Sequence, residues 1–128
     1  LDSCEDIVEC YGLFGRRLDH QVMVIGDISN YVQDKNTVFN IYSESKLELT
    51  IFPEGEHLIS RVGLFSLLSF KDQKIAIFGN IKYELGLIAA ENLDSISSHG
   101  LSNEGYGEFT LKCTSPVVIF YPDNDNIY

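Results

Sequence analysis

Long hydrophobic runs are missing from this sequence. The longest uncharged apolar stretch covers residues 62–70 and is interrupted by Gly63, Ser66 and Ser69. It is far shorter than the roughly 20 residues that a membrane-spanning helix needs. Residues 1–6 carry no basic group ahead of an apolar run, so they do not have the form of a secretory signal. We therefore expect no transmembrane helix.

Basic residues are also scarce. Nine Lys and Arg stand against nineteen Asp and Glu, which gives a formal net charge of -10. Such a charge repels nucleic acid and anionic membrane surfaces and attracts basic proteins over long range. The composition therefore predicts no nucleic-acid or membrane partner and favours a basic protein partner.

Cysteine is represented by Cys4, Cys10 and Cys113, an odd number with no CxxC spacing. This usage favours reduced thiols and a cytoplasmic protein over an oxidised scaffold. A bridge from Cys4 to Cys10 or from Cys10 to Cys113 stays open if the protein is exported.

Short motifs that indicate a cofactor site or a catalytic nucleophile are absent from the sequence. It contains neither GxxxxGK[ST] nor GxGxxG, which bind nucleotides, and no GxSxG, which holds a nucleophilic serine. No cofactor is predicted, and no catalytic residue. His20, His57 and His99 form no HxH or HExxH pair. Asp19 beside His20 could act as an acid and base, but neighbours in sequence often point apart, and a surface turn is the preferred interpretation of this pair.

One short segment, PEGEH, brings two carboxylates and an imidazole together at a predicted strand end. Glu54, Glu56 and His57 are therefore candidate metal ligands or proton carriers. The alternative is a solvated turn whose acids precede a helix.

What the sequence does contain is typical of a folded protein. It is 45% hydrophobic, with seven Tyr and eight Phe, so residues 1–128 are expected to form a single globular domain around one core.

Two helices are predicted from three- and four-residue spacing of apolar side chains. The first follows a Ser3-x-x-Asp6 cap and carries Ile7, Cys10, Tyr11 and Phe14. The second carries Leu58, Val62, Phe65 and Leu68.

Strands are predicted from β-branched or alternating segments. Residues 21–28 read as a buried strand. Thr37–Ser43 and Lys46–Phe52 read as a hairpin turning at Glu44-Ser45, with one wet face. Residues 74–89 read either as a hairpin turning at Gly79-Asn80 or as one strand with Gly79 as a bulge. Residues 108–113 and 117–121 complete the set.

The predicted class is α+β, a mostly antiparallel curved sheet of about six or seven strands with one or two helices packed on it; a small β-barrel is the alternative. Unpaired strand edges leave homo-oligomerisation possible.

The longest stretch without periodicity, residues 91–107, is a candidate functional loop. Tyr106 lies at its end with Glu104 and Glu108, an aromatic among acids that could anchor a basic partner. The Asp-Asn-Asp-Asn run at residues 123–126 lacks the Gly and distal Glu of a calcium loop and is interpreted as an acidic tail.

These features favour an acidic protein-binding or inhibitory module over an enzyme. Such a module would cover a basic partner, as an immunity-type protein neutralising a toxin does. The alternatives are a small metal-dependent enzyme using His57 with Glu54 and Glu56, or a structural domain of a larger assembly.

Overall fold

The computed structural model describes residues 6–12, 17–33, 35–84, 94–95 and 103–122. The predictions for Ser3, Cys4, His99, residues 85–93 and residues 123–126 lie outside this part of the chain. The elements are β1 (Asp6–Tyr11), α1 (Leu18–Val32), β2 (Thr37–Ser43), β3 (Lys46–Phe52), β4 (Gly55–Leu68), β5 (Lys74–Ile81), β6 (Asp94–Ser95), β7 (Asn103–Cys113) and β8 (Val117–Phe120).

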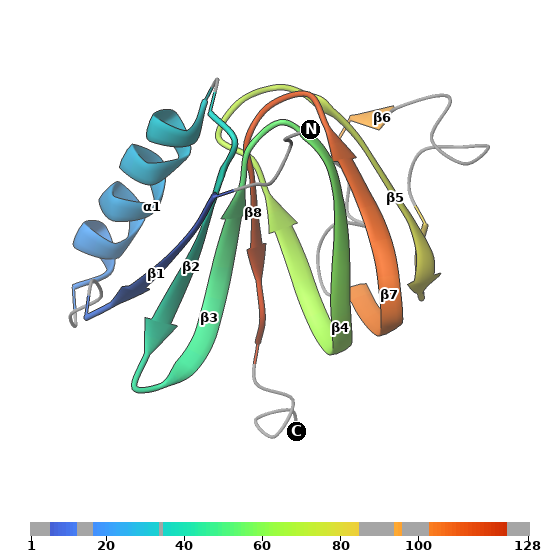
Figure 1. Ribbon diagram of the computed structural model, residues 1–128, viewed down its shortest axis with the longest axis horizontal. Coiled ribbons are helices and arrows are strands. Elements are labelled where there is room, and N and C mark those ends of the chain that lie inside the picture. The colour runs from blue at the N-terminus through green and yellow to red at the C-terminus, as the bar shows by residue number, and fades with distance from the viewer. Residues whose placement is uncertain (1–5, 13–16, 34, 85–93, 96–102, 123–128) are drawn as a thin grey trace.

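The strands form a mixed sheet in the order β1-β2-β3-β8-β4-β7-β5-β6 (Figure 1). β1 and β2 are parallel, and the other neighbours are antiparallel. β1 and β6 end the sheet on opposite sides, so the sheet is not closed. The protein is mostly sheet with one helix among the described residues, which confirms the predicted class in part. The sheet is mixed because β1 and β2 are parallel, and the alternative of a small barrel is wrong because the sheet is not closed.

The long strand β4 connects two parts of this sheet. Residues 55–65 of β4 pair with β7, and residues 66–68 pair with β8. Apolar side chains of both parts meet in one buried cluster, which includes Phe52, Phe65, Leu67, Ile77, Phe109, Leu111 and Ile119. Burial of this apolar surface is the main stabilising contribution to the fold.

A second buried cluster lies between α1 and the sheet. It joins Ile25 and Val32 of α1 to Ile41, Leu49, Ile51 and Val118. Figure 1 shows α1 lying beside β1 and β2 at one end of the sheet. With 15 residues, α1 is not long and apolar enough to cross a membrane, and the described residues contain no helix that is.

The predicted N-terminal helix is wrong. Residues 6 to 11 form strand β1, which pairs along its whole length with β2. Gly12 follows with φ +74°, a left-handed conformation in which a helix cannot continue. Four apolar positions fitted helical spacing, but the backbone bonds to β2 decide the conformation.

The strand predicted for residues 21–28 is also wrong, because these residues lie within α1. The buried positions are Ile25, Ser29 and Val32, with Gln21 and Ile28 half-buried. This is the period of a helix with one face on the core. The β-branched residues of the segment favour strands only through packing, and here they pack as a helix.

The helix predicted around Leu58 and Val62 is wrong as well. These two side chains are 68% and 75% exposed, whereas His57, Ile59, Phe65 and Leu67 are buried. Burial therefore alternates along β4, as it does in a strand. The three- and four-residue spacing combined residues from both faces.

The hairpin of β2 and β3 is confirmed. Glu44 and Ser45 have φ of 53° and 70°, as in the two-residue turns that match strand twist. The wet face predicted for β3 is wrong at Thr50, which is buried.

Gly79 is confirmed as a bulge, but β5 ends at Ile81, so the strand predicted to continue through residues 82–84 is wrong there. The pairing of β5 with β7 shifts register between Gly79 and Ile81. The strand predicted at residues 108–113 lies within β7, and β8 covers residues 117–120 of the strand predicted at 117–121. β7 begins at Asn103, so the end of the predicted loop at residues 103–107 is strand.

Candidate functional site

Four polar side chains lie side by side across the sheet and are called the polar row here: Glu9, Asn40, Thr50 and Tyr121. The strand register places Glu9 opposite Asn40 and Asn40 opposite Thr50. Tyr121 follows β8, and its backbone N–H donates to the Glu48 carbonyl of β3 at 3.0 Å. The row therefore crosses from the edge strand β1 to the end of β8.

Hydrogen bonds connect the polar row from end to end. The Tyr121 hydroxyl lies 2.9 Å from Thr50 Oγ1, and Thr50 Oγ1 donates to Asn40 Oδ1 at 2.7 Å. Asn40 Nδ2 donates to Glu9 Oε2 at 3.1 Å. Thr50 and Tyr121 are buried while Glu9 is exposed. The row thus anchors an exposed carboxylate to a buried polar network.

Glu9 receives a second donor from Tyr42. The bond from the Tyr42 hydroxyl, followed by that from Asn40, lowers the pKa of Glu9. The same bond raises the pKa of Tyr42 to about 12. Glu9 is therefore ionised and Tyr42 neutral at physiological pH.

The ring of Tyr42 stacks on that of Tyr11, and the two are called the tyrosine pair here. Their centroids are 4.6 Å apart and their planes 13° apart. Parallel pairing of β1 with β2 places them opposite one another. Glu9 and Tyr11 lie two residues apart on β1 and so on one face of it. An anionic carboxylate and two electron-rich rings thus form one surface.

At the buried end of the polar row, Arg61 of β4 lies against Tyr121. The guanidinium carbon is 5.1 Å from the ring centroid, and Nη2 donates to the Pro122 carbonyl at 3.0 Å. Burial raises the pKa of Tyr121, while the bond to Thr50 and the charge of Arg61 act in the opposite direction.

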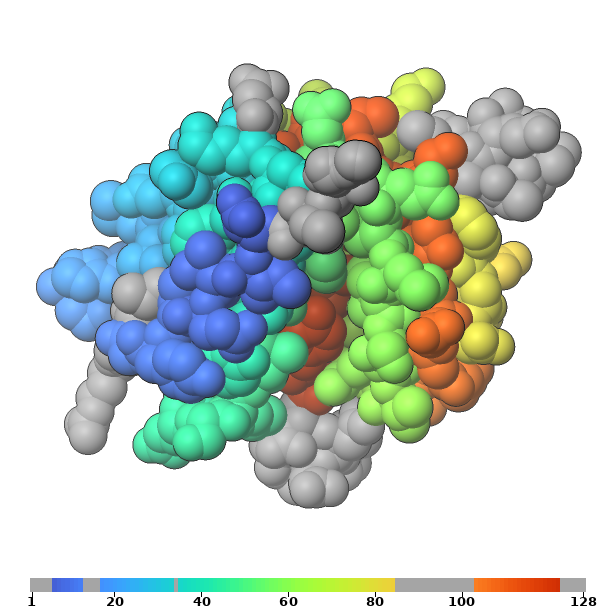
Figure 2. Space-filling view, in the orientation of Figure 1, coloured from blue at the N-terminus to red at the C-terminus, as the bar shows by residue number. Residues whose placement is uncertain are grey.

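Figure 2 shows a depression between the β3 and β4 segments, with β8 at its floor.

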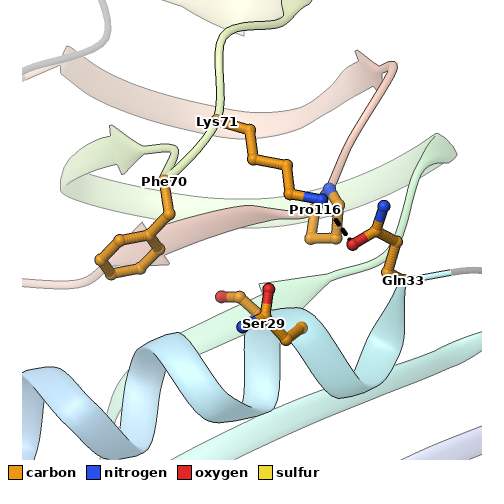
Figure 3. A pocket seen from close by; sticks show the side chains of 6 residues that line it. Ser29, Gln33, Phe70, Lys71 and Pro116 are labelled. Carbon is orange, nitrogen blue, oxygen red and sulfur yellow. Dashed lines mark hydrogen bonds between the residues drawn. The ribbon is translucent and has the colours of Figure 1, made fainter.

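A small pocket lies elsewhere, between α1 and the β4–β5 connection (Figure 3). Its lining residues are Ser29, Asn30, Gln33, Phe70, Lys71 and Pro116. Lys71 Nζ donates to Gln33 Oε1 at 2.6 Å, which joins the connection to α1. None of the six side chains is a carboxylate or an imidazole, so they offer no acid–base pair.

Asp19 and His20 lie in the first turn of α1, both exposed. Arg17 donates to both carboxylate oxygens of Asp19, at 3.1 and 2.6 Å, and these bonds lower the pKa of Asp19. The backbone N–H of His20 also donates to Asp19. Asp19 is therefore bonded to Arg17 and to the His20 backbone, as in the surface turn preferred for this pair.

The PEGEH segment forms the connection from β3 into β4. Glu54 and Glu56 are exposed, whereas His57 is buried, with Nε2 2.8 Å from the Pro53 carbonyl oxygen. Among the described residues, no group of three His, Cys, Asp or Glu side chains could hold a metal ion. A metal role for Glu54, Glu56 and His57 stays a prediction.

Two further sets of residues were singled out from the sequence. Glu104, Tyr106 and Glu108 alternate along β7, where Tyr106 is 55% exposed and pairs with Val62; a partner at this surface stays a prediction. Cys10 and Cys113 are not joined by a disulfide, and the Cys113 thiol lies 3.4 Å from the Pro53 carbonyl oxygen.

The polar row and the tyrosine pair were not predicted as a site. Tyr42 and Tyr121 fall within predicted strands, where core packing is the default role of an aromatic side chain. A regular hairpin turning at Glu44-Ser45 would place Asn40 opposite Leu49. A register shift between Ile41 and Tyr42 places Asn40 opposite Thr50 instead, so no local signal in the sequence indicated this pair.

Comparison with known proteins gives a structural answer only. No protein-family model matches the chain, and no curated protein is similar enough in sequence to count as a relative. Thiamine pyrophosphokinase from Bacillus subtilis has a TM-score of 0.69 and 22% identity, over 92% of this chain and 56% of that one. The Candida albicans enzyme gives 0.63 and 16%, over 93% and 46%. Yeast thiamin pyrophosphokinase gives 0.60 and 16%, over 87% and 38%.

The chain therefore has a fold found in thiamine pyrophosphokinase structures and spans about half or less of the length of each. This finding corrects the prediction of an inhibitory or immunity-type module, because the structural neighbours named here are enzymes. That prediction was based on net charge, which affects solubility and long-range attraction but does not determine a fold.

Proposed function

We propose that this chain forms part of an enzyme of the thiamine pyrophosphokinase type. The observation that carries the proposal is the structural likeness to the Bacillus subtilis enzyme, which covers 92% of this chain at a TM-score of 0.69. The proposed reaction transfers a pyrophosphoryl group from ATP to the hydroxyl of thiamine. Fold alone is an argument by analogy, so the chemistry of the site must add to it.

The polar row and the tyrosine pair supply such chemistry. An exposed carboxylate that accepts two hydrogen bonds is held in a fixed position, as a group that binds or orients a substrate must be. Thiamine carries a positively charged ring. An acidic surface therefore attracts thiamine more strongly than it would attract an uncharged substrate.

The proposed reaction balances without a further reactant. The thiamine hydroxyl attacks the β-phosphorus of ATP, and the bond from this phosphorus to the α,β-bridging oxygen breaks. AMP leaves and the hydroxyl proton is released to solvent. The products are thiamine diphosphate and AMP in equal amounts.

An assay of both products tests the proposal. The protein, purified as it occurs in its source, is incubated with thiamine, ATP and Mg²⁺, and the products are separated by chromatography. We expect thiamine diphosphate and AMP to appear together and only when thiamine is present. ATP turnover that is independent of thiamine, or no turnover at all, would contradict the proposal.

A further inference from the structure

We infer that Glu9, Tyr11 and Tyr42 form the binding site for the cationic thiazolium ring of thiamine. This inference rests on the proposed function and deepens it, since it names the residues of this chain that recognise the substrate.

The geometry presents an open aromatic surface. Tyr11 and Tyr42 stack at 4.6 Å, so each ring has one face toward the other. Tyr11 is 62% exposed, which leaves room for a planar ligand at the pair. A flat aromatic cation can extend such a stack, because the face of a tyrosine ring attracts positive charge.

The charge of Glu9 is met by neutral groups. The groups that lower its pKa are the Tyr42 hydroxyl and the Asn40 amide. Neutral donors fix the carboxylate and keep it ionised, but they do not cancel its charge. A ligand cation at the tyrosine pair would therefore meet an oriented negative charge as well as the rings.

The chain's own cations lie on other rings. Lys35 lies over Tyr31, Arg61 over Tyr121 and Lys82 over Tyr83. In the described part of the chain, no Lys or Arg is placed over Tyr11 or Tyr42. The tyrosine pair is therefore a stacked aromatic surface with a carboxylate beside it. This surface can accept a cation from a ligand.

Titration calorimetry with thiamine tests the site. Glu9→Gln removes the charge and keeps the shape, and Tyr11→Ala removes one ring. We expect each to raise the Kd for thiamine by roughly 3- to 30-fold, the range of a cation–π or single-charge contact. Tyr11→Phe keeps the ring and should bind within about twofold of wild type.

Two controls make the result specific. Tyr31→Ala removes a comparably exposed ring on α1, 55% exposed, and should leave the Kd for thiamine unchanged. Thiochrome, an uncharged fused-ring derivative, serves as a second probe, and its binding should not respond to Glu9→Gln. Thermal unfolding of every variant shows that the comparison is made between folded proteins.

The outcomes separate this inference from the proposed function. If the wild type forms thiamine diphosphate while Glu9→Gln and Tyr11→Ala keep the wild-type Kd, the site is wrong and the function stands. If thiamine binding depends on Glu9 and Tyr11 but no thiamine diphosphate forms, the site stands and the function is wrong. A wild type that does not bind thiamine overturns the site directly.

Discussion

The hydroxyls of Thr50 and Tyr121 lie 2.9 Å apart, although 71 positions separate the two residues in the sequence. Both residues are buried, and the bond joins β3 to the segment that follows β8. It is also the inner end of the polar row that holds Glu9. Stability and the candidate site are therefore connected through one buried hydrogen bond.

Replacing Thr50 with valine keeps the volume of the side chain but removes its hydroxyl. The Tyr121 hydroxyl and Asn40 Oδ1 each lose a partner. Because unsatisfied buried polar groups are costly, the free energy of unfolding should fall by about 1–3 kcal/mol, measured by urea denaturation. Thr37→Val, at a half-buried position of β2, is the matched control, and an equal loss there would contradict the account.

Gly79 and Gly26 should respond in opposite directions to substitution by alanine. Gly79 has φ +127°, and a Cβ there would lie 2.9 Å from Phe109 Cα, whereas a Cβ at Gly26 of α1 meets nothing within 4 Å. Gly79→Ala should destabilise the fold by about 1–3 kcal/mol, and Gly26→Ala should stabilise it by about 0.5–1 kcal/mol. Thermal unfolding of both variants measures these effects. If the two midpoints shift in the same direction, the bulge at Gly79 does not exclude a side chain as proposed.

Asn103 holds the backbone of Tyr83, which follows the end of β5. Its Oδ1 accepts from the backbone N–H of Tyr83 and Glu104, and its Nδ2 donates to the Tyr83 carbonyl. It is completely buried. Asn103→Ala leaves these groups without that partner, so we expect a loss of about 1–3 kcal/mol and faster hydrogen exchange at the Tyr83 amide. Unchanged exchange at that amide would contradict the role assigned to Asn103.

The bond between Glu9 and Tyr42 should be visible in a tyrosine titration. It raises the pKa of Tyr42 from 10.0 to about 12. Because the folded-state pKa is the higher one, this contribution to stability is complete below pH 10 and is lost as the pH rises toward 12. Glu9→Gln should lower the pKa of Tyr42, followed by ultraviolet absorbance, and an identical titration curve in this variant would rule the bond out.

The same bond has a second consequence at acidic pH. The pKa of Glu9 is lowered from 4.5 in the folded state. Its contribution to stability is therefore present above pH 4.5 and is lost as the pH falls through the folded-state pKa. Tyr42→Phe should reduce this acid dependence in denaturation curves recorded at several pH values; curves that respond to acid as in wild type would count against it.

The sequence predicted those elements whose signals are local. The β2–β3 hairpin has a two-residue turn at Glu44-Ser45. Pro116 separates β7 from β8, because proline has no backbone N–H to donate to a neighbouring strand. The bulge at Gly79 was one of two stated alternatives. Turn chemistry acts over a few residues and can be recognised without knowledge of the fold.

The sequence misled where neighbours in space decide the structure. β1 is a strand because β2 lies beside it, and α1 is a helix although residues 21–28 favour strands by composition. Leu58 and Val62 are exposed on β4, so treating every apolar residue as buried produced a false helical stripe.

The candidate site was missed for a related reason. Glu9, Asn40, Thr50 and Tyr121 come from four separate segments, and only the sheet order brings them together. No short motif contains two of them. The residues proposed from local sequence, Glu54, Glu56 and His57, are close along the chain but divided between the surface and the interior.

The most direct test of the account is an experimental structure of the protein with thiamine bound. We predict that the thiazolium ring lies within about 6 Å of the Tyr11 ring centroid and next to the Glu9 carboxylate. Thiamine bound at another surface, or no bound thiamine at saturating concentration, would contradict the account.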